Sequence, residues 1–463
     1  MNKLTANHIH FIGIGGISMS GLAEVLKHNG HTVTGSDDHP TPVTTHLQNI
    51  GIPVAIPNAA TNITPAIDLV VYTAAVKETN PEYQAAKAQN IPLLERAELL
   101  GLMLPNYPHA ICVAGTHGKT SSTALMSEIL LEADLDPTIS IGGHMGRDGT
   151  NYRVGNSSYF VLESCEYNNS YHHWHPHIGI ILNMDFDHPD FFKDIDAVVV
   201  SFKKFAQNIR PEGVLVIQEG IYGQDTVTED LDCEVVTFGT SKNADFWPRN
   251  ITYNHLGHPS FEIMTGKNPL AQVHLPLPGL YNMLNALATF AAAFELGLAP
   301  EEIATALSHA KGVKRRFEQK GQYNQAYIID DYAHHPTEIT ACLTAANTAI
   351  QKLGGKLYCL FQSHTYSRTK ELLQDFAQSL TQTHHLGLLP IFPSRESFDP
   401  TISHLHLAQE VQKLSTTPAP DITTFQNFDE AVAFYKEKLC PNDMLITMGA
   451  GDVYIVGERV LLP

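Results

Sequence analysis

The stretch "HAICVAGTHGKTSSTALMSEILLEADL", residues 109–135, holds the pattern that decides the fold of this chain. Its apolar start predicts a buried strand, and its second half has the apolar spacing of a helix. Between them lies the glycine-rich loop GTHGKT, residues 115–120. A strand, a glycine-rich loop and a helix in this order indicate an α/β unit with a phosphate-binding loop. The full pattern has another glycine where Val113 stands, so the motif alone does not identify the reaction.

The residue types in this loop suit nucleotide phosphates. Glycines let the backbone approach the phosphate oxygens, and the helix N-terminus offers free N–H groups. Lys119 can reach the outer phosphates, and the Thr120 hydroxyl can bind Mg²⁺. The alternative is a turn before an ordinary helix, but a lysine at a helix start opposes the helix dipole. The expected phosphate contacts are Gly115, Thr116, His117, Gly118, Lys119, Thr120 and Ser121.

Strand and helix patterns alternate along the rest of the chain, which predicts parallel sheets joined by crossover helices. Because 463 residues are too many for one core, we expect two or three domains. Three alternating units place the boundaries near residues 106 and 312. The predicted strands cover residues 8–14, 31–37, 68–75, 109–115, 159–164, 178–184, 213–218, 326–332, 356–362 and 443–449. The predicted helices cover residues 18–30, 80–90, 120–135, 282–297, 372–380 and 429–439.

The composition narrows the class of protein. The net charge of −19 argues against nucleic acid as the main partner. The sequence has no long uncharged apolar run, so we expect no transmembrane helix. The N-terminal segment lacks the features of a signal peptide. Six cysteines are scattered without a C-x-x-C pair, which argues against a disulfide framework or a cysteine zinc site. We therefore expect a cytoplasmic protein without membrane partners.

Acidic and amide side chains follow two predicted strands downstream of the loop. "VLESCEY" supplies Glu163 and Glu166, and "ILNMDFDHPD" supplies Asn183, Asp187 and His188. The carboxyl ends of strands in an open sheet are where ligands bind, so these groups can meet the phosphate loop and hold Mg²⁺. Alone, the glutamate could form a surface ion pair and the histidine could cap a helix, but together they favour a metal site.

A histidine-rich segment, "SYHHWHPH", supplies His172, His173, His175 and His177. Four imidazoles in eight residues could bind a transition metal. No cysteine or carboxylate accompanies them at tight spacing. We favour a polar, partly exposed segment without a metal.

A second glycine-rich turn, "GIGGISMSG" (residues 13–21), follows the first strand and opens a helix. A nicotinamide dinucleotide site would have a third glycine where Ser18 stands and an acid about 20 residues on, near Asp37. The turn therefore favours a nucleotide diphosphate at a helix N-terminus, of NAD or of another nucleotide. The alternative is a tight turn without a ligand.

With these segments in view, nearly the whole chain resembles the Mur ligase family of bacterial cell-wall synthesis. The similar segments, in the family's order, are "HFIGIGGISMSGLAEVL", "AGTHGKTSST", "NMDFDHPD", "LPGLYNMLNALA", "GVKRRFE", "DDYAHHPTEI", "FQSHTYSRT" and "LITMGAGDVYIVGERVL". The last segment is most similar to the alanine-adding branch. The resemblance implies a Rossmann-like UDP-sugar domain at 1–106, a P-loop ATPase-type domain at 107–312 and a Rossmann-like amino-acid domain at 313–463.

The reaction implied by the resemblance is ATP-dependent amide formation with Mg²⁺. A carboxylate is a poor acyl donor, so the γ-phosphate of ATP would convert the carboxylate of UDP-N-acetylmuramate to an acyl phosphate. The amine of L-alanine would then attack and release phosphate. The implied partners are these two substrates, and the chain would be a monomer or a weak homodimer.

The resemblance also implies roles for residues at matching positions. The implied catalytic residues are Lys119, Glu163 and His188, and the implied metal ligands are Thr120, Glu163 and His188. The implied ATP contacts beyond the loop are Asn282, Asn285, Arg316 and Asp331. The implied UDP-sugar contacts are Gly13, Gly15, Gly16, Ser18, Met19, Ser20, Asp37 and Thr73. The implied L-alanine contacts are Tyr332, His334, His364 and Arg368, with Arg368 on the amino-acid carboxylate.

The chain departs from the family pattern at several positions. Tyr281 stands where many relatives have histidine, and Thr365 where many have arginine. Cys165 and Asn168 stand where acids are usual. No lysine occupies an obvious metal-bridging position, as is usual for the alanine-adding branch.

Three alternatives stay open at this point. The chain could add a different amino acid, or a recycled peptide, to the same sugar nucleotide, and glycine or serine could enter a small pocket because one methyl group discriminates only modestly. It could be a nucleotide-gated sensor of wall precursors, although Lys119, Thr120, Glu163 and His188 together favour an enzyme. It could be an NAD oxidoreductase, which Ser18 and the second nucleotide loop disfavour.

Overall fold

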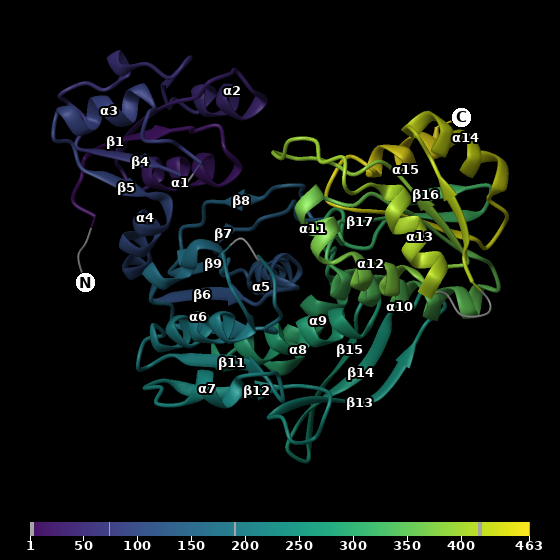
Figure 1. Ribbon diagram of the computed structural model, residues 1–463. Coiled ribbons are helices and arrows are strands. Elements are labelled where there is room, and N and C mark those ends of the chain that lie inside the picture. The colour runs from purple at the N-terminus through teal and green to yellow at the C-terminus, as the bar shows by residue number, and fades with distance from the viewer. Residues whose placement is uncertain (1–3, 74, 189–190, 415–418, 463) are drawn as a thin grey trace. The chain divides into compact units, whose positions relative to one another are not determined.

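The computed structural model describes residues 4–73, 75–188, 191–414 and 419–462. Its backbone forms three β-sheets with helices packed against them (Figure 1). The chain divides into two compact units, which are described separately. The first holds Met1–His144, Asp148–Phe246 and Ala288–Ile303, and the second holds Met145–Arg147, Trp247–Leu287 and Ala304–Pro463. Across the described ranges, no helix has both the length and the apolar character of a membrane span.

The N-terminal sheet has five parallel strands in the order β3-β2-β1-β4-β5. Its strands are β1 (His8–Ile12), β2 (Thr32–Ser36), β3 (Val54–Ala55), β4 (Leu69–Tyr72) and β5 (Leu93–Glu95). Its helices are α1 (Ile17–His28), α2 (Pro42–Asn49), α3 (Pro81–Ala88), α4 (Arg96–Met103), and the 3₁₀ turns η1 (Ala60–Asn62) and η2 (Leu104–Asn106). The chain order reverses on either side of β1, so the turn after β1 lies at a switch point, where α/β sheets bind ligands.

The sequence predicted the first strand two residues too long. β1 ends at Ile12 because Gly13 has φ +75°, a left-handed conformation that starts the turn. The strand predicted at 68–75 is confirmed as β4, and Ala74 lies outside the described residues.

The central sheet has ten strands in the order β15-β14-β13-β12-β11-β10-β6-β9-β7-β8. Its strands are β6 (His109–Ala114), β7 (Thr138–Ser140), β8 (Tyr152–Arg153), β9 (Tyr159–Glu163), β10 (Ile178–Ile181), β11 (Val214–Gln218), β12 (Glu234–Phe238), β13 (Phe246–Tyr253), β14 (Pro259–Thr265) and β15 (Asn268–His274). Its helices are α5 (Lys119–Glu132), α6 (Ile195–Gln207), α7 (Gln224–Thr228), α8 (Leu280–Glu295), α9 (Pro300–His309) and the 3₁₀ segment η3 (Tyr167–His173). The sequence did not predict the antiparallel pairing of β14 with β15.

Strand β6 lies within the parallel part of this sheet. It pairs with β10 on one side and with β9 on the other, both in parallel. Because β6, β9 and β10 run in one direction, their carboxyl ends lie at one edge of the sheet. The phosphate loop and both predicted acidic segments follow these three strands, so the topology places them together.

The C-terminal sheet has six strands in the order β16-β17-β21-β18-β19-β20, and only the β16–β17 pair is antiparallel among the described strands. Its strands are β16 (Glu318–Tyr323), β17 (Ala326–Asp331), β18 (Leu357–Phe361), β19 (His385–Leu388), β20 (Asp421–Thr424) and β21 (Met444–Met448). Its helices are α10 (Pro336–Leu353), α11 (Tyr366–Glu371), α12 (Leu373–Leu380), α13 (His404–Leu414), α14 (Phe428–Lys438) and α15 (Tyr454–Leu461). Buried apolar side chains such as Ile329, Phe361 and Ile446 fill its core.

Candidate active site

The phosphate loop joins β6 to α5, as predicted. Gly118 has φ +82°, which glycine adopts without strain, and it caps the helix. Gly115 has φ +139°, and a Cβ there would lie 2.9 Å from the Cβ of Leu182 on the segment after β10. The two glycines are therefore required for the turn itself and for its close approach to the neighbouring strand.

Residues after β10 hold the loop in shape. The His117 N–H donates to Oδ1 of Asn183 at 2.8 Å, and the Asn183 amide returns a hydrogen bond to the His117 carbonyl at 3.0 Å. Thr116 exchanges two hydrogen bonds with the backbone of Asp185, at 2.9 and 3.1 Å. The Asp185 carboxylate also lies 3.0 Å from the His117 ring. Asn183, a candidate metal ligand from the sequence, thus braces the loop.

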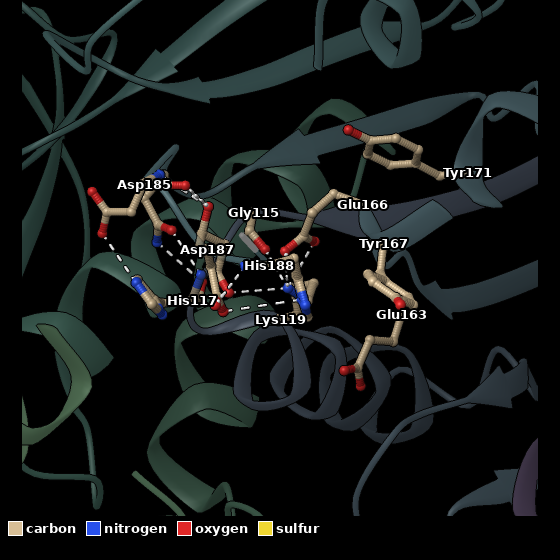
Figure 2. A network of polar contacts seen from close by, with 12 residues as sticks. Gly115, His117, Lys119, Glu163, Glu166, Tyr167, Tyr171, Asp185, Asp187 and His188 are labelled. Atoms are coloured by element: carbon tan, nitrogen blue, oxygen red, sulfur yellow. Dashed lines mark hydrogen bonds and ion pairs between the residues drawn. The ribbon is translucent and has the colours of Figure 1, made fainter. Parts of the chain in front are cut away.

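Lys119 lies under the loop with its ammonium group fully engaged. It donates to the carbonyls of Gly115 and Thr116 at 2.6 and 3.0 Å and to both carboxylate oxygens of Glu166 at 2.9 and 3.2 Å. Burial disfavours the charged ammonium, but the charges of Glu166 and Glu163 and the hydrogen bonds to Glu166 together outweigh burial and raise the pKa of Lys119. The lysine is therefore a cation at pH 7, paired with Glu166 at the start of α5 (Figure 2).

Thr120 and Glu163, two of the predicted metal ligands, are in direct contact. The Thr120 hydroxyl donates to Oε1 of Glu163 at 2.9 Å, and the N–H of Gly142 donates to Oε2 at 2.6 Å. A hydroxyl and a carboxylate are the hard oxygen ligands that Mg²⁺ prefers. This pair fits the ion that the sequence predicts.

His188, the third predicted ligand, faces Glu166. Its Nε2 lies 3.9 Å from Oε1 of Glu166 and 4.0 Å from Oδ2 of Asp187. The Tyr167 ring lies against the imidazole with a centroid distance of 4.8 Å. The structure thus assembles two adjoining groups: Thr120 with Glu163, and His188 with Glu166 and Cys165.

The histidine-rich segment has the polar, partly exposed character that we favoured. The His172 ring bonds to the carbonyl of Ser201 at 2.9 Å, and the His175 ring to the carbonyl of Asn208 at 3.1 Å. Burial lowers the pKa of His172. In the described part of the chain, the side chains close enough to share a metal do not include these histidines.

The first glycine-rich turn is tied to the end of β2. The Gly15 N–H donates to Oδ2 of Asp37 at 2.8 Å. A Cβ on Gly15 would lie 2.7 Å from that oxygen, so no other residue fits beside the carboxylate. Arg96 donates to the Ser18 hydroxyl at 2.8 Å and brings a partly buried cation to the turn.

The other predicted UDP-sugar contacts take different positions. Gly16 is the N-cap of α1 and Thr73 follows β4, so both lie at the carboxyl edge of the sheet. The Met19 side chain packs in the hydrophobic core, and the Ser20 hydroxyl donates to the Ile17 carbonyl at 3.0 Å. The Met19 side chain therefore serves the fold, and the proton of the Ser20 hydroxyl is engaged within α1.

In the second unit, α8 carries the predicted adenine contacts. Asn282 and Asn285 are both buried, and the Asn282 amide donates to the Pro278 carbonyl at 2.9 Å. Burial raises the pKa of the neighbouring Tyr281, with Asp331 and Arg316 close enough to act on it electrostatically. Tyr281, at the start of α8, thus lies near the predicted ATP contacts Asp331 and Arg316.

The Asp331 carboxylate at the end of β17 is held by backbone donors. It accepts from the N–H groups of Phe317 and Ala333, both at 2.7 Å. Burial raises the pKa of Asp331 to about 6, while the cation of Arg316 acts in the opposite direction. Arg316 itself lies 3.7 Å from Glu338 and over the Tyr332 ring at 5.3 Å.

The structure brings together the predicted amino-acid contacts. Nδ1 of His334 lies 3.0 Å from the Tyr332 carbonyl and 3.3 Å from Oε2 of Glu338. The rings of His334 and His364 are 6.2 Å apart, and the charge of Arg368 acts on both. Burial lowers the pKa of His334 to about 4, so the ring is neutral at pH 7.

Comparison with known proteins identifies the family. Three family models match in chain order: "Mur ligase family, catalytic domain" at residues 8–107, "Mur ligase middle domain" at 113–293 and "Mur ligase, glutamate ligase domain" at 315–451. A UDP-N-acetylmuramate–L-alanine ligase of Agathobacter rectalis is 46% identical over 454 residues, which cover 98% of this chain and 97% of the relative. The chain belongs to the Mur ligase family. The three-domain α/β class predicted from the sequence is thereby confirmed.

Other Mur ligases are similar along the full length. A UDP-N-acetylmuramate–L-alanine ligase of Lachnospira eligens is 44% identical, over 98% of this chain and 98% of the relative. The crystal structure of a UDP-N-acetylmuramate–alanine ligase from Thermotoga maritima matches with a TM-score of 0.79 at 26% identity, over 98% of both chains. A murein peptide ligase of Psychrobacter arcticus matches with a TM-score of 0.67 at 26% identity, over 98% of both chains.

For this Mur ligase, sequence reasoning missed several residues that shape the site. Glu166 was left out of the predicted catalytic set, although it is the carboxylate that pairs with Lys119. Asp185, Arg96 and Glu338 were also missed, and each holds a predicted site residue. Asp185 lies two residues after Asn183, and Glu338 lies four residues after His334. Their closeness to a predicted site residue was therefore the signal that could have identified them.

Proposed function

We propose that this chain joins L-alanine to the carboxylate of UDP-N-acetylmuramate at the expense of ATP, with release of ADP and phosphate. The observation that carries the proposal is the Lys119 ammonium, held between the phosphate loop and Glu166 beside the Thr120–Glu163 pair. A protein that only bound nucleotide would not need this cation where phosphoryl transfer occurs. The relatives that are 41–46% identical over the full chain carry the name of this ligase.

The chemistry needs charge neutralisation and positioning. The substrate carboxylate attacks the γ-phosphorus of ATP, which forms an acyl phosphate and releases ADP. The L-alanine amine then attacks the acyl carbon, and phosphate leaves from the tetrahedral intermediate. Lys119 would neutralise negative charge on the transferred group, and the N–H groups at the start of α5 would bind the other phosphates.

The residues present fit Mg²⁺. Thr120 would hold a first ion, and Glu163 and His188 would hold a second. The ion would supply Lewis-acid stabilisation of phosphate charge. The roles of Lys119 and the loop N–H groups do not depend on which of these ligands is engaged.

The outer domains supply the other substrates in this proposal. Residues 1–106 would bind the UDP group, with its phosphates at the start of α1, where Gly15 is held by Asp37. Residues 107–312 would bind ATP, and Asn282 and Asn285 would contact adenine. Residues 313–463 would bind L-alanine.

Within the C-terminal domain, Arg368 would pair with the alanine carboxylate, because a guanidinium matches its geometry. Tyr332, His334 and His364 would line the pocket. His334, neutral at pH 7, would add no positive charge that repels a substrate ammonium group. Arg316 and Asp331 would contact ATP from the same domain.

The first experiment is phosphate release from ATP with Mg²⁺ and UDP-N-acetylmuramate, measured with each of the twenty amino acids. The proposal requires release that depends on the sugar nucleotide and is largest with L-alanine. Release that is largest with glycine or serine would keep the mechanism and change the substrate. No release with any amino acid, together with tight binding of the sugar nucleotide, would favour a sensor of wall precursors.

A further inference from the structure

Cys165, Glu166 and His188 form a cluster beside the proposed magnesium ligands. One ligand atom from each residue lies within 4.8 Å of the other two. We searched the described residues for three or more histidine, cysteine, aspartate or glutamate side chains whose ligand atoms lie this close together, and these three residues form the group found. We define these three residues as the thiol cluster.

The ligand types of the thiol cluster differ from those that Mg²⁺ takes. Magnesium binds oxygen ligands, whereas a thiolate, an imidazole and a carboxylate are the set that Zn²⁺ and similar soft ions prefer. The Thr120–Glu163 pair next to it offers oxygen alone. The two groups therefore favour different cations.

The spacing is close to that of a bound ion. Bonds of about 2.0–2.3 Å in a tetrahedral zinc site place the ligand atoms about 3.5 Å apart. A separation of at most 4.8 Å needs side-chain movements of about 1 Å, which rotamer adjustment provides. Three protein ligands leave the fourth position for water or a substrate oxygen, as in open zinc sites.

Glu166 can bind this ion through one carboxylate oxygen while its other oxygen keeps the hydrogen bond from Lys119. Its Oε2 is the oxygen nearer to Lys119, at 2.9 Å, and its Oε1 is the oxygen that faces His188, at 3.9 Å. A divalent ion on Oε1 would nevertheless stand close to the Lys119 ammonium and repel it. It would also occupy His188, which would then no longer be available as a magnesium ligand (Figure 2).

We propose that the thiol cluster binds a thiophilic divalent cation of the Zn²⁺ class, and that the bound ion inhibits the enzyme. Binding breaks the S–H bond of Cys165, forms a sulfur–metal bond and releases the proton to the buffer. The ligands follow two different strands, β9 and β10, so no C-x-x-C spacing marks them in the sequence. Binding does not depend on the proposed function, whereas inhibition rests on it.

Cobalt is the probe for the binding step. One equivalent of Co²⁺ added to the full-length, nucleotide-free protein should give a thiolate-to-cobalt charge-transfer band, which Zn²⁺ should remove by displacement. The band should be lost in Cys165→Ser and in Cys165→Ala, and kept in Cys440→Ser, which changes an exposed free cysteine. Absence of the band in the parent protein, or its persistence in Cys165→Ser, overturns the proposal.

Turnover tests the inhibition. With Mg²⁺ and ATP in excess, Zn²⁺ should inhibit the parent protein, and Cys165→Ser should need at least about tenfold more Zn²⁺ to lose half of its own zinc-free turnover. Equal sensitivity of the two proteins would show that zinc acts elsewhere and would overturn the inhibitory role. If the parent protein shows no turnover at all, the proposed function fails, and the cobalt band still decides the metal site.

Discussion

Glu166 holds the Lys119 ammonium through both carboxylate oxygens, at 2.9 and 3.2 Å. The carboxylate is buried, so water screens the attraction between the two charges only weakly. The phosphate-loop lysine of this Mur ligase is thus fixed before any nucleotide arrives. A γ-phosphate that enters the loop must compete with Glu166 for the same cation.

The first prediction concerns this cation. Lys119→Ala should lower kcat by about 10³-fold, because one preorganised charge on the transferred phosphoryl group is lost. The fold should persist, since Lys119 lies at the first turn of α5. Phosphate release and circular dichroism measure both effects. Lys203→Ala, which removes a lysine paired with Glu229 at 3.0 Å, is the matched control and should leave turnover unchanged.

The second prediction compares the loss of one charge of the Lys119–Glu166 pair with the loss of both. Glu166→Gln removes the counter-charge of a buried ammonium, which should reduce the free energy of unfolding by about 3 kcal/mol. Lys119→Met combined with Glu166→Gln should be more stable than the sum of the two single losses predicts, because no charge is left unpaired. Urea denaturation of the four proteins measures this coupling. Strict additivity would mean that the two charges do not interact.

Much of the fold followed from local patterns. Buried strands and helices each have a short-range apolar periodicity that the sequence shows directly. This periodicity predicted the positions of β1, β6, β10, β17 and β21 to within a few residues. Strands β13, β14 and β15 were missed, among them the antiparallel pair β14–β15, because their pairing depends on contacts that no local period records.

The candidate site was predicted less completely than the fold. Glycines and Lys119 are constrained by the loop itself, so the motif identified them. The local pattern alone did not separate Glu166 from Glu163, because both acids lie at the carboxyl end of β9, and it was the family resemblance that selected Glu163. Only their three-dimensional partners distinguish them: Thr120 and Gly142 for Glu163, and Lys119 for Glu166.

The third prediction concerns the first glycine-rich turn. Asp37→Ala removes the acceptor of the Gly15 N–H and loosens the turn that would bind the UDP group. The KM for UDP-N-acetylmuramate should rise about tenfold, and the KM for ATP should stay unchanged. Asp38→Ala is the control, since this exposed acid accepts from Asn58 and does not contact the turn. Equal rises in both KM values would remove Asp37 from the sugar-nucleotide site.

The fourth prediction concerns Arg368. Arg368→Ala should raise the KM for L-alanine by at least about tenfold, because a charge-assisted carboxylate contact is lost. The KM for ATP should change far less. Lys370→Ala changes an exposed cation on the same helix, which lies 3.8 Å from Asp399, and should change neither value. Steady-state kinetics with each substrate varied in turn make the comparison, and a parallel rise in both KM values would place Arg368 outside the amino-acid pocket.

The last prediction concerns pH. The pKa of His334 is lowered from 6.5 to about 4, first because the ring is buried. At pH 5 the unfolded chain therefore binds a proton that the folded chain does not, so folding stability is present above pH 6.5 and is lost as pH falls toward 4. The shift corresponds to about 3 kcal/mol. Asp331 acts in the opposite direction, because its pKa is raised to about 6 by burial and its contribution is lost as pH rises.

A comparison of the parent protein with His334→Gln isolates the histidine, because the Asp331 contribution is present in both. The difference in unfolding free energy should be constant above pH 6.5. Below that, the parent protein should lose stability relative to the variant, down to about pH 4. His173→Gln, at an exposed histidine, is measured alongside as the control for the substitution itself. A flat difference for His334→Gln would mean that the His334 ring accepts a proton in the folded protein as readily as in the unfolded chain.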